Sequence, residues 1–282
     1  MAHVHLGPTD PTMRLAKPVV WRATRSPEGA ASFRVGRLPD TDRVRVDARG
    51  PRAAWVGRHA AARTGLLDDP TVFDPDHAVL RPLAKKHRGV HLPRTLTVVE
   101  RMVPVILQQL VTWREAMRAM MGLTAKYGED APGPAGLRLL PTSEKLARLP
   151  EYAFAALGAL AKQARTLRGV ATHARKLEAL VDRPYDEAAA FLEKLPGVGP
   201  WTSALTLVAA TGHPDAVPLC DLHLPKEVGW ALARDRDADD DRMLELLEPF
   251  AGHRWRAIHL IRAAHLGPER RGPRRPMRRI HS

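Results

Sequence analysis

The alternation of apolar and polar residues predicts a small sheet near the start of the chain. The segments VVWRATRS and ASFRVGR flank the turn signal PEGA, which is typical of two antiparallel strands. DRVRVDAR alternates strictly, with Val44 and Val46 on one face. AAWVGRHAAARTGLL then indicates a helix closed by Gly65. We therefore expect a small antiparallel sheet plus helix domain at residues 15–76.

Apolar spacing at three and four residues takes over from about residue 77 and predicts a helical core over 77–265. Thr112 with Glu115 three residues later forms a capping box, which should open a helix running through Met121. GEDAPGPAG is predicted to be a loop. Further helices should begin at Asp186, near Pro200 and at Asp221. The fold class is mainly α with a small N-terminal α+β domain, and residues 1–14 and 266–282 are expected to be disordered.

The helical pattern is interrupted by the stretch LEKLPGVGPW, a predicted hairpin at about 192–203. Pro196 stops one helix, and Pro200 suits the first turn of the next. Gly197 and Gly199 allow positive φ and leave the backbone open to close approach. Amides at such a corner, beside a helix N-terminus, attract an anion such as a DNA phosphate. An ordinary turn between two helices would have the same sequence pattern, so this stretch alone does not establish a phosphate-binding hairpin.

Charge narrows the choice of partner. The 282-residue chain carries a formal net charge of +13, which favours nucleic acid or an anionic membrane surface. No apolar run has the length of a membrane span, and MAHVHLGPTDPT lacks the order of a secretory signal. We therefore expect a cytoplasmic protein that binds nucleic acid. The single Cys220 excludes an internal disulfide and a four-cysteine cluster.

Taken together, LPGVGPWTSALTLVA, the following VPLCDLHLPKEVGWAL and the earlier VPVILQQLVT resemble the helix–hairpin–helix DNA glycosylase superfamily. Within it, the chain is most similar to the alkylpurine branch, the 3-methyladenine DNA glycosylase II type of actinobacteria. The resemblance covers most of the chain. It implies a two-lobed helical glycosylase core whose hairpin residues bind DNA phosphate. These residues are Leu195, Gly197, Val198, Gly199 and Thr202.

The resemblance implies that Asp221 is the catalytic residue. Breaking an N-glycosidic bond builds positive charge on the deoxyribose, and a nearby carboxylate stabilises that charge. Its position at a helix N-terminus should keep Asp221 ionised. An aspartate there could also serve only as an N-cap, or could do both. The sequence leaves open whether Asp221 activates water or only stabilises charge.

Trp201 stands where lyase members of the superfamily carry the lysine that forms a Schiff base. Lys194 and Lys226 lie nearby in sequence but do not match that position. We therefore expect a monofunctional enzyme. Trp201 could form a wall of the base pocket, since an aromatic face stacks on a cationic alkylated base, or it could be part of the core.

The remaining site residues follow from the same resemblance. Leu110 matches the wedge that fills the gap left by an extruded base, and Gln109 could touch the orphaned base. Leu110 could instead complete an apolar contact at a helix end. Trp113 and His223 are expected beside the pocket, with His223 orienting the site. The carbonyls of Leu195 and Val198 could hold a structural monovalent cation, and no other cofactor is expected.

Three functions remain open from the sequence. The leading one is release of alkylated purines such as 3-methyladenine or 7-methylguanine, by a monomer acting in base excision repair. Leu205 and Ala264 are small or aliphatic where relatives can carry aromatic side chains, which leaves room for a deaminated, oxidised or bulky purine lesion instead. A non-catalytic helix–hairpin–helix DNA-binding protein is the third.

Overall fold

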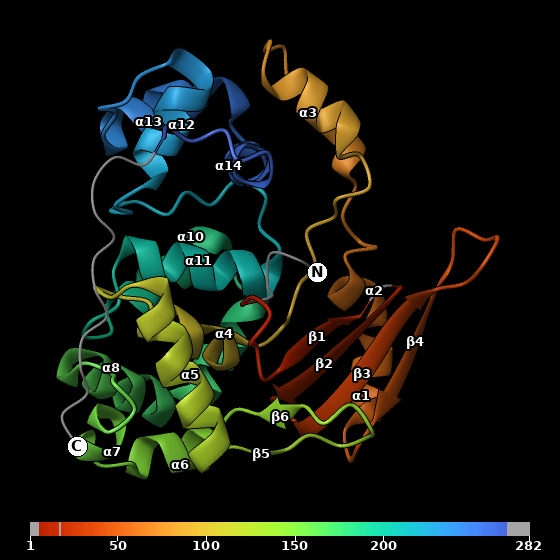
Figure 1. The fold of residues 1–282 in the computed structure, drawn as a ribbon, viewed down its shortest axis with the longest axis vertical. Helices are drawn as coiled ribbons and strands as arrows, with labels where there is room; N and C mark the ends of the chain where they lie inside the picture. The colour runs from red at the N-terminus through yellow and green to blue at the C-terminus, as the bar shows by residue number, and fades with distance from the viewer. Residues whose placement is uncertain (1–5, 17, 270–282) are drawn as a thin grey trace.

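The computed structural model describes residues 6–16 and 18–269. Our expectations for residues 1–5 and 270–282 lie outside this range. The chain begins with a four-stranded antiparallel sheet in the order β1-β2-β3-β4 (Figure 1). Its strands are β1 (Met13–Ala16), β2 (Val19–Ser26), β3 (Gly29–Arg37) and β4 (Val44–Arg49). The predicted pairing of the two strands around PEGA is confirmed, and the pair Ser26↔Gly29 leaves a turn of two residues between them.

Both faces of this sheet are covered in part. Phe33 on β3 packs against Trp55 and Val56 of α1 (Ala53–Arg58). The helix predicted over this stretch is interrupted at His59, and α2 (Ala60–Thr64) ends at Gly65 with a φ of +87°. Ala23 on the opposite face of β2 packs with Leu137 and Leu139 from the helical part. The sheet is thus held between its own helix and a segment more than one hundred residues further along.

The prediction of disorder before residue 15 is wrong for the residues that the structure describes. Met13 begins strand β1, and the side chains of Leu6 and Asp10 are buried. Asp10 accepts hydrogen bonds from the amides of Leu6 and Thr12, at 3.0 and 2.8 Å. Leu6 contributes to the large helical core. The local sequence did not predict this order, because Leu6 packs against helices that are distant in the chain.

The rest of the described chain is mainly helical, and among its helices none is both long enough and apolar enough to cross a membrane. The α-helices after the sheet are α3 (Leu80–Lys86), α4 (Val98–Leu107), α5 (Trp113–Tyr127), α6 (Ser143–Arg148), α7 (Glu151–Ala155), α8 (Ala161–Thr172), α9 (Ala174–Glu178), α10 (Tyr185–Glu193), α11 (Pro200–Thr211), α12 (Leu224–Ala233), α13 (Asp240–Leu247) and α14 (Arg254–Ala263). Short 3₁₀ turns lie at Pro70–Val72, Ala179–Asp182 and Glu248–Phe250.

Two predictions within this region need correction. The capping box at Thr112 and Glu115 is present, but α5 continues to Tyr127 rather than ending at Met121. Gly122 stays helical because Leu123 and Thr124 continue the buried stripe. The predicted loop after α5 contains two short antiparallel strands, β5 (Glu129–Asp130) and β6 (Arg138–Leu139). Strands of two residues give no periodic signal in a sequence.

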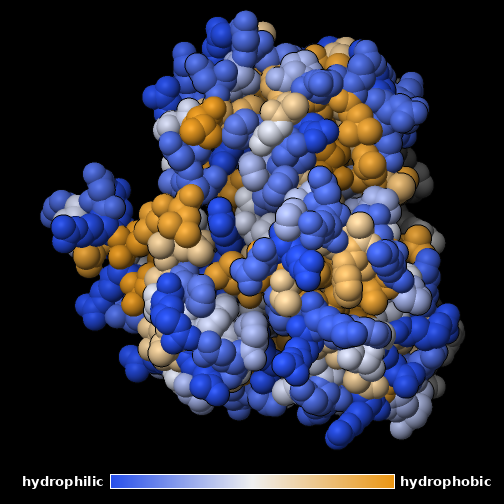
Figure 2. Space-filling view, turned by 180° about the vertical axis from the view of Figure 1, so that it is seen from behind, coloured by the Kyte–Doolittle hydropathy of each residue, from blue (hydrophilic) through white to orange (hydrophobic). Residues whose placement is uncertain are grey.

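The helical part has two cores, as the two-lobed prediction requires. One lies among α4 to α10, and the other joins α3 with α12, α13 and α14 (Figure 1). Helix α11 belongs to both, because Leu207 and Ala210 enter the first core while Ala204 and Val208 enter the second. Figure 2 shows that hydrophilic side chains cover most of the face seen from behind, with apolar patches between them. The predicted fold class is confirmed.

The sheet is fixed to the helical part through a buried carboxylate in the first turn of α4. Glu100 pairs with Arg22 of β2 at 2.9 Å, and both side chains are almost fully buried. Glu100 also accepts a hydrogen bond from the Thr24 hydroxyl at 2.9 Å. Because a buried charge is costly unless it is paired, this contact fixes how the sheet sits on the helices.

Candidate active site

The hairpin between α10 and α11 is built as the sequence predicts. The Val198 amide donates to the Leu195 carbonyl at 3.0 Å, which closes a turn with Gly197 at φ +85°. A Cβ on Gly197 would collide with the Thr166 hydroxyl of α8, so this corner requires glycine. Gly199 is the N-cap of α11, and its carbonyl accepts from the Thr202 amide at 2.9 Å.

The corner leaves backbone donors without a partner. Within the described part of the chain, the amides of Gly197 and Gly199 have no hydrogen-bond acceptor. They lie directly before a twelve-residue helix whose first turn carries no acidic residue. Unpaired amides at a helix N-terminus attract an anion. The hairpin can therefore bind a phosphate through its backbone.

Asp221 lies in the loop that follows α11, and three donors fix its carboxylate. Its Oδ1 accepts from the amides of His223 at 2.8 Å and Leu224 at 2.9 Å. Its Oδ2 accepts from the indole Nε1 of Trp201 at 2.7 Å. Helix α12 begins at Leu224 rather than at Asp221, because the aspartate side chain, not its backbone, occupies the start of the helix.

The electrostatics of Asp221 favour its charged form. Partial burial would raise the pKa of this carboxyl, but the His223 amide, the Trp201 indole and the Leu224 amide together hold the pKa below its usual value. Hydrogen bonds donated to a carboxylate stabilise its anion. Asp221 is therefore a fixed negative charge across the neutral pH range.

Trp201 has a contact that the sequence did not predict. It is a half-buried side chain whose indole donates to Asp221. The neighbouring segment is held as well, since Cys220 has a φ of +63° and its amide donates to Asp240 at 2.7 Å. Leu222 projects from this turn with 79% of its surface exposed. The sequence analysis missed Leu222, although an apolar residue directly after Asp221 could have drawn attention to it.

Leu110 occupies the turn between α4 and α5. Its side chain is 70% exposed and its φ is +60°, a conformation that a leucine rarely adopts. A buried contact at the helix end, the alternative kept open above, is therefore wrong. The exposed position agrees with a wedge.

The side chain of Gln109 has partners within the protein. Its Nε2 donates to the Gly197 carbonyl at 2.9 Å and to the Thr202 hydroxyl at 2.8 Å. Its Oε1 is buried. The side chain therefore points into the hairpin, and the predicted contact with DNA is not supported.

Trp113 and His223 are both at the surface. Trp113 is the first residue of α5 and is 49% exposed, with one edge beside Gly7 of the N-terminal segment. His223 is the exposed N-cap of α12, and its backbone amide rather than its ring contacts Asp221. Gln109 donates to Thr202, and Trp201, its neighbour in the chain, donates to Asp221, so the first turn of α11 contacts both the turn that carries Leu110 and the carboxylate.

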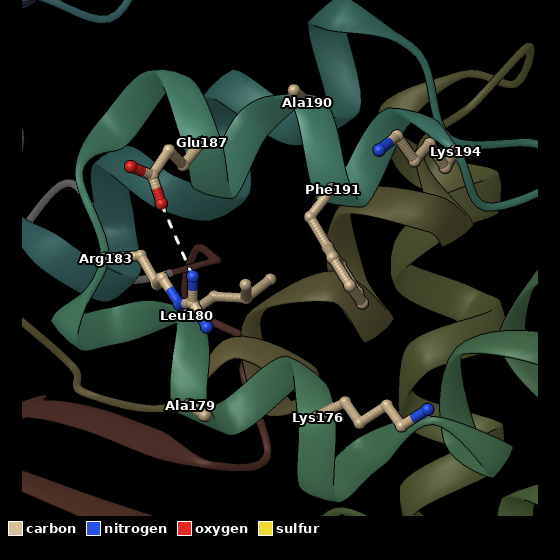
Figure 3. Close-up of a pocket in the computed structure, with 8 residues that line it drawn as sticks. All are labelled: Lys176, Ala179, Leu180, Arg183, Glu187, Ala190, Phe191 and Lys194. Carbon is tan, nitrogen blue, oxygen red and sulfur yellow. Dashed lines mark hydrogen bonds and ion pairs between the residues drawn. The ribbon is translucent and has the colours of Figure 1, made fainter.

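A cavity of about 650 Å³ lies elsewhere, between α9 and α10 (Figure 3). Phe191 and Leu180 line it, and Lys176 and Lys194 flank one end. None of the predicted site residues lines this cavity. Among the residues that the structure describes, no group of three or more His, Cys, Asp or Glu side chains could hold a metal ion.

Comparison with known proteins places the fold. No protein-family model matches the chain. Over 155 residues it is 32% identical to the probable bifunctional transcriptional activator/DNA repair enzyme AlkA of Mycobacterium tuberculosis, a match covering 54% of this chain and 30% of that protein. The chain thus matches less than a third of the relative's length.

Solved structures are similar over almost the whole chain. The 3-methyladenine DNA glycosylase of Archaeoglobus fulgidus superposes with a TM-score of 0.78 at 20% identity, covering 94% of this chain and 93% of that one. The Clostridium acetobutylicum 8-oxoguanine glycosylase/lyase, in complex with DNA containing 8-oxoguanine, gives 0.65 at 16% identity, covering 90% and 98%. The chain therefore has the fold of the helix–hairpin–helix glycosylases, and the predicted resemblance is confirmed at that level.

Proposed function

We propose that this protein is a monofunctional DNA glycosylase that releases alkylated purines from double-stranded DNA. One observation carries the proposal: Trp201, which directly follows a hairpin with unpaired amides, donates a hydrogen bond to the carboxylate of Asp221 in the loop after α11. The similarity to a DNA repair enzyme and to 3-methyladenine glycosylase structures supports it.

The chemistry follows from the fixed charge. When the bond between C1′ and the base nitrogen breaks, its electron pair leaves with the base, and C1′ becomes positive. The Asp221 anion stabilises that charge, as carboxylates do in glycoside hydrolysis. Water then adds to C1′ and loses a proton to solvent. Because the pKa of Asp221 is lowered, the carboxylate is a weak base, so we assign it mainly to charge stabilisation.

The absence of lyase chemistry is part of the proposal. The indole nitrogen of Trp201 cannot form a Schiff base, and it already donates to Asp221. Lys194, directly after α10, and Lys226, on α12, are exposed, and in the described part of the chain neither forms a hydrogen bond or ion pair with Asp221. We expect sodium borohydride to trap no covalent complex between the wild-type protein and DNA. A trapped complex would show that an amine in this chain attacks the sugar.

Asp221→Asn tests the catalytic role. Base release from methylated duplex should fall by more than about 100-fold, because one electrostatic contact in the transition state contributes roughly that much. Binding to undamaged duplex should remain, since the hairpin is unchanged. The released bases are identified by chromatography. Asp240→Asn, which affects the neighbouring Cys220 contact, is the matched control. Undiminished release by Asp221→Asn would contradict the assignment of Asp221 as the catalytic residue.

An oxidised purine is the second candidate substrate. The similarity to an 8-oxoguanine glycosylase/lyase structure favours it, as do the aliphatic Leu205 and Ala264 in place of aromatic walls. Duplexes carrying one lesion each separate the candidates. Release of 3-methyladenine or 7-methylguanine, but not of 8-oxoguanine, is expected.

We also propose that the protein acts as a monomer in the cytoplasm. A monovalent cation at the Leu195 and Val198 carbonyls is a further part of the proposal. The Leu195 carbonyl accepts one hydrogen bond and keeps a second lone pair for an ion, whereas the Gly197 carbonyl between them is used by Gln109. Such an ion would be structural and would supply no step of the reaction.

A further inference from the structure

We propose that Gln109 is a positioning residue that joins the wedge turn to the hairpin. The hairpin that binds DNA phosphate and the wedge that replaces the extruded base then form one rigid unit. The wedge turn is residues 108–112, which carry Leu110. The inference rests on the proposed function, because it assigns a part of that same DNA-binding site.

Both N–H groups of the Gln109 side-chain amide donate hydrogen bonds to the hairpin. A primary amide has two N–H donors. One donates to the Gly197 carbonyl at 2.9 Å and the other to the Thr202 hydroxyl at 2.8 Å. Thr202 is buried and lies in the first turn of α11. The two acceptors therefore lie on either side of Gly199, and Gln109 holds both halves of the hairpin corner.

The backbone of the wedge turn is held from a second side. Gln163 of α8 is buried, and its Nε2 donates to the carbonyls of Leu107 at 3.1 Å and Gln109 at 2.7 Å. Its Oε1 accepts from the Leu160 amide at 2.8 Å. Three residues later on the same helix, Thr166 packs against Gly197. Helix α8 thus contacts the wedge turn and the hairpin together.

This double support accounts for the conformation of Leu110. A non-glycine residue in the left-handed region costs of order 1–3 kcal/mol and persists only where its surroundings hold it. Leu110 has a φ of +60° and directly follows Gln109. The side chain of Gln109 is bound to the hairpin, and its carbonyl is bound to Gln163. The wedge is therefore set in place before DNA arrives, which lowers the ordering cost of inserting it.

The test compares Gln109→Leu with Gln108→Leu. Gln108 is the matched control because its Nε2 donates only to the Pro104 carbonyl within α4. Affinity for an undamaged duplex is measured by fluorescence anisotropy, and exchange of the Val198 amide by NMR. Extrusion is followed with 2-aminopurine in the duplex. None of these readouts requires base release, so a wrong catalytic assignment would leave them interpretable.

We expect Gln109→Leu to weaken binding to undamaged duplex roughly tenfold, as loss of paired polar contacts implies, and to speed Val198 exchange to a similar degree. Gln108→Leu should change neither. Leu110→Ala should impair extrusion while leaving the exchange of the Val198 amide unchanged, because its side chain is exposed. The contrast separates a residue that braces the hairpin from one that touches only DNA bases.

The opposite pattern would overturn the inference. If Gln109→Leu impairs extrusion alone and leaves Val198 exchange and undamaged binding unchanged, Gln109 acts at the base and not on the hairpin. Should Gln109→Leu fail to fold, Thr202→Val removes one of the two acceptors with little change in shape. The same loss of Val198 protection is then expected, and unchanged protection would contradict the proposal.

Discussion

At the scale of single residues, the pair Trp201 and Asp221 decides the chemistry of the site. The indole donor and two backbone amides occupy both carboxylate oxygens, at distances between 2.7 and 2.9 Å. A carboxylate with this many donors cannot rotate freely, and its anion is stabilised. Trp201 thus fixes both the direction and the charge of the group that we propose as catalytic.

Replacing Trp201 with phenylalanine should therefore raise the pKa of Asp221. The folded-state pKa is lowered in part by the indole hydrogen bond, so losing that donor moves the pKa upward. The acid limb of the pH–rate profile for base release should therefore shift to higher pH. Single-turnover rates measured across pH check this. An unshifted acid limb with a lower plateau would mean that Trp201 acts only through the base pocket.

At the scale of elements, helix α4 ends at the wedge turn, and its first amides are bound by a buried acid from another helix. Glu178 of α9 accepts from the amides of Val98 and Val99 at 2.7 and 3.0 Å. Burial raises the pKa of Glu178 to about 7, against the lowering effect of those two amides. The helix that presents Leu110 is thus capped by a group that titrates near neutral pH.

This cap predicts a pH-dependent stability. Between about pH 4.5 and 7 the folded protein binds more protons at Glu178 than the unfolded chain does. The free energy of unfolding should therefore fall as pH rises through that window, by at most about 3 kcal/mol. Glu178→Gln should remove this contribution. Urea unfolding of both proteins at several pH values measures the difference, and parallel curves would show that Glu178 is already ionised in the fold.

The elements also show what a sequence can predict. The hairpin corner, the capping box of α5 and the pairing of β2 with β3 follow from local spacing, and each is confirmed. The hydrogen bond from Gln109 to the Gly197 carbonyl was not predicted, because the two residues are 88 positions apart and no local pattern specifies such a contact. The Trp201–Asp221 bond could not be derived for the same reason, although both residues were identified as part of the site.

At the scale of the whole molecule, a buried ion pair joins the small sheet to the helical part, beside the apolar contacts of Ala23 with Leu137 and Leu139. Arg22 and Glu100 are both almost fully buried, and Thr24 adds a third contact. Such a pair is costly to break, because removing one partner leaves the other charge buried and alone.

Glu100→Ala should accordingly lower the free energy of unfolding by about 3–5 kcal/mol. Glu129→Ala is the control, since Glu129 pairs with Arg25 but is half exposed, and its loss should cost less than about 1 kcal/mol. Chemical unfolding of the two variants measures both. Equal losses would show that the sheet is held mainly by its apolar contacts.

Helix α11 has a consequence for dissecting the protein. Its Leu207 packs into the first core and its Ala204 into the second, so both cores need this one helix. A fragment that ends before Pro200 would lack α11 and therefore part of the first core. A fragment that begins at Pro200 would expose the side of α11 that packs into that core. Neither piece should be monomeric and native by itself. Mixed together, the two should reassemble, and the regained signal would report directly on the contacts that α11 makes with each partner.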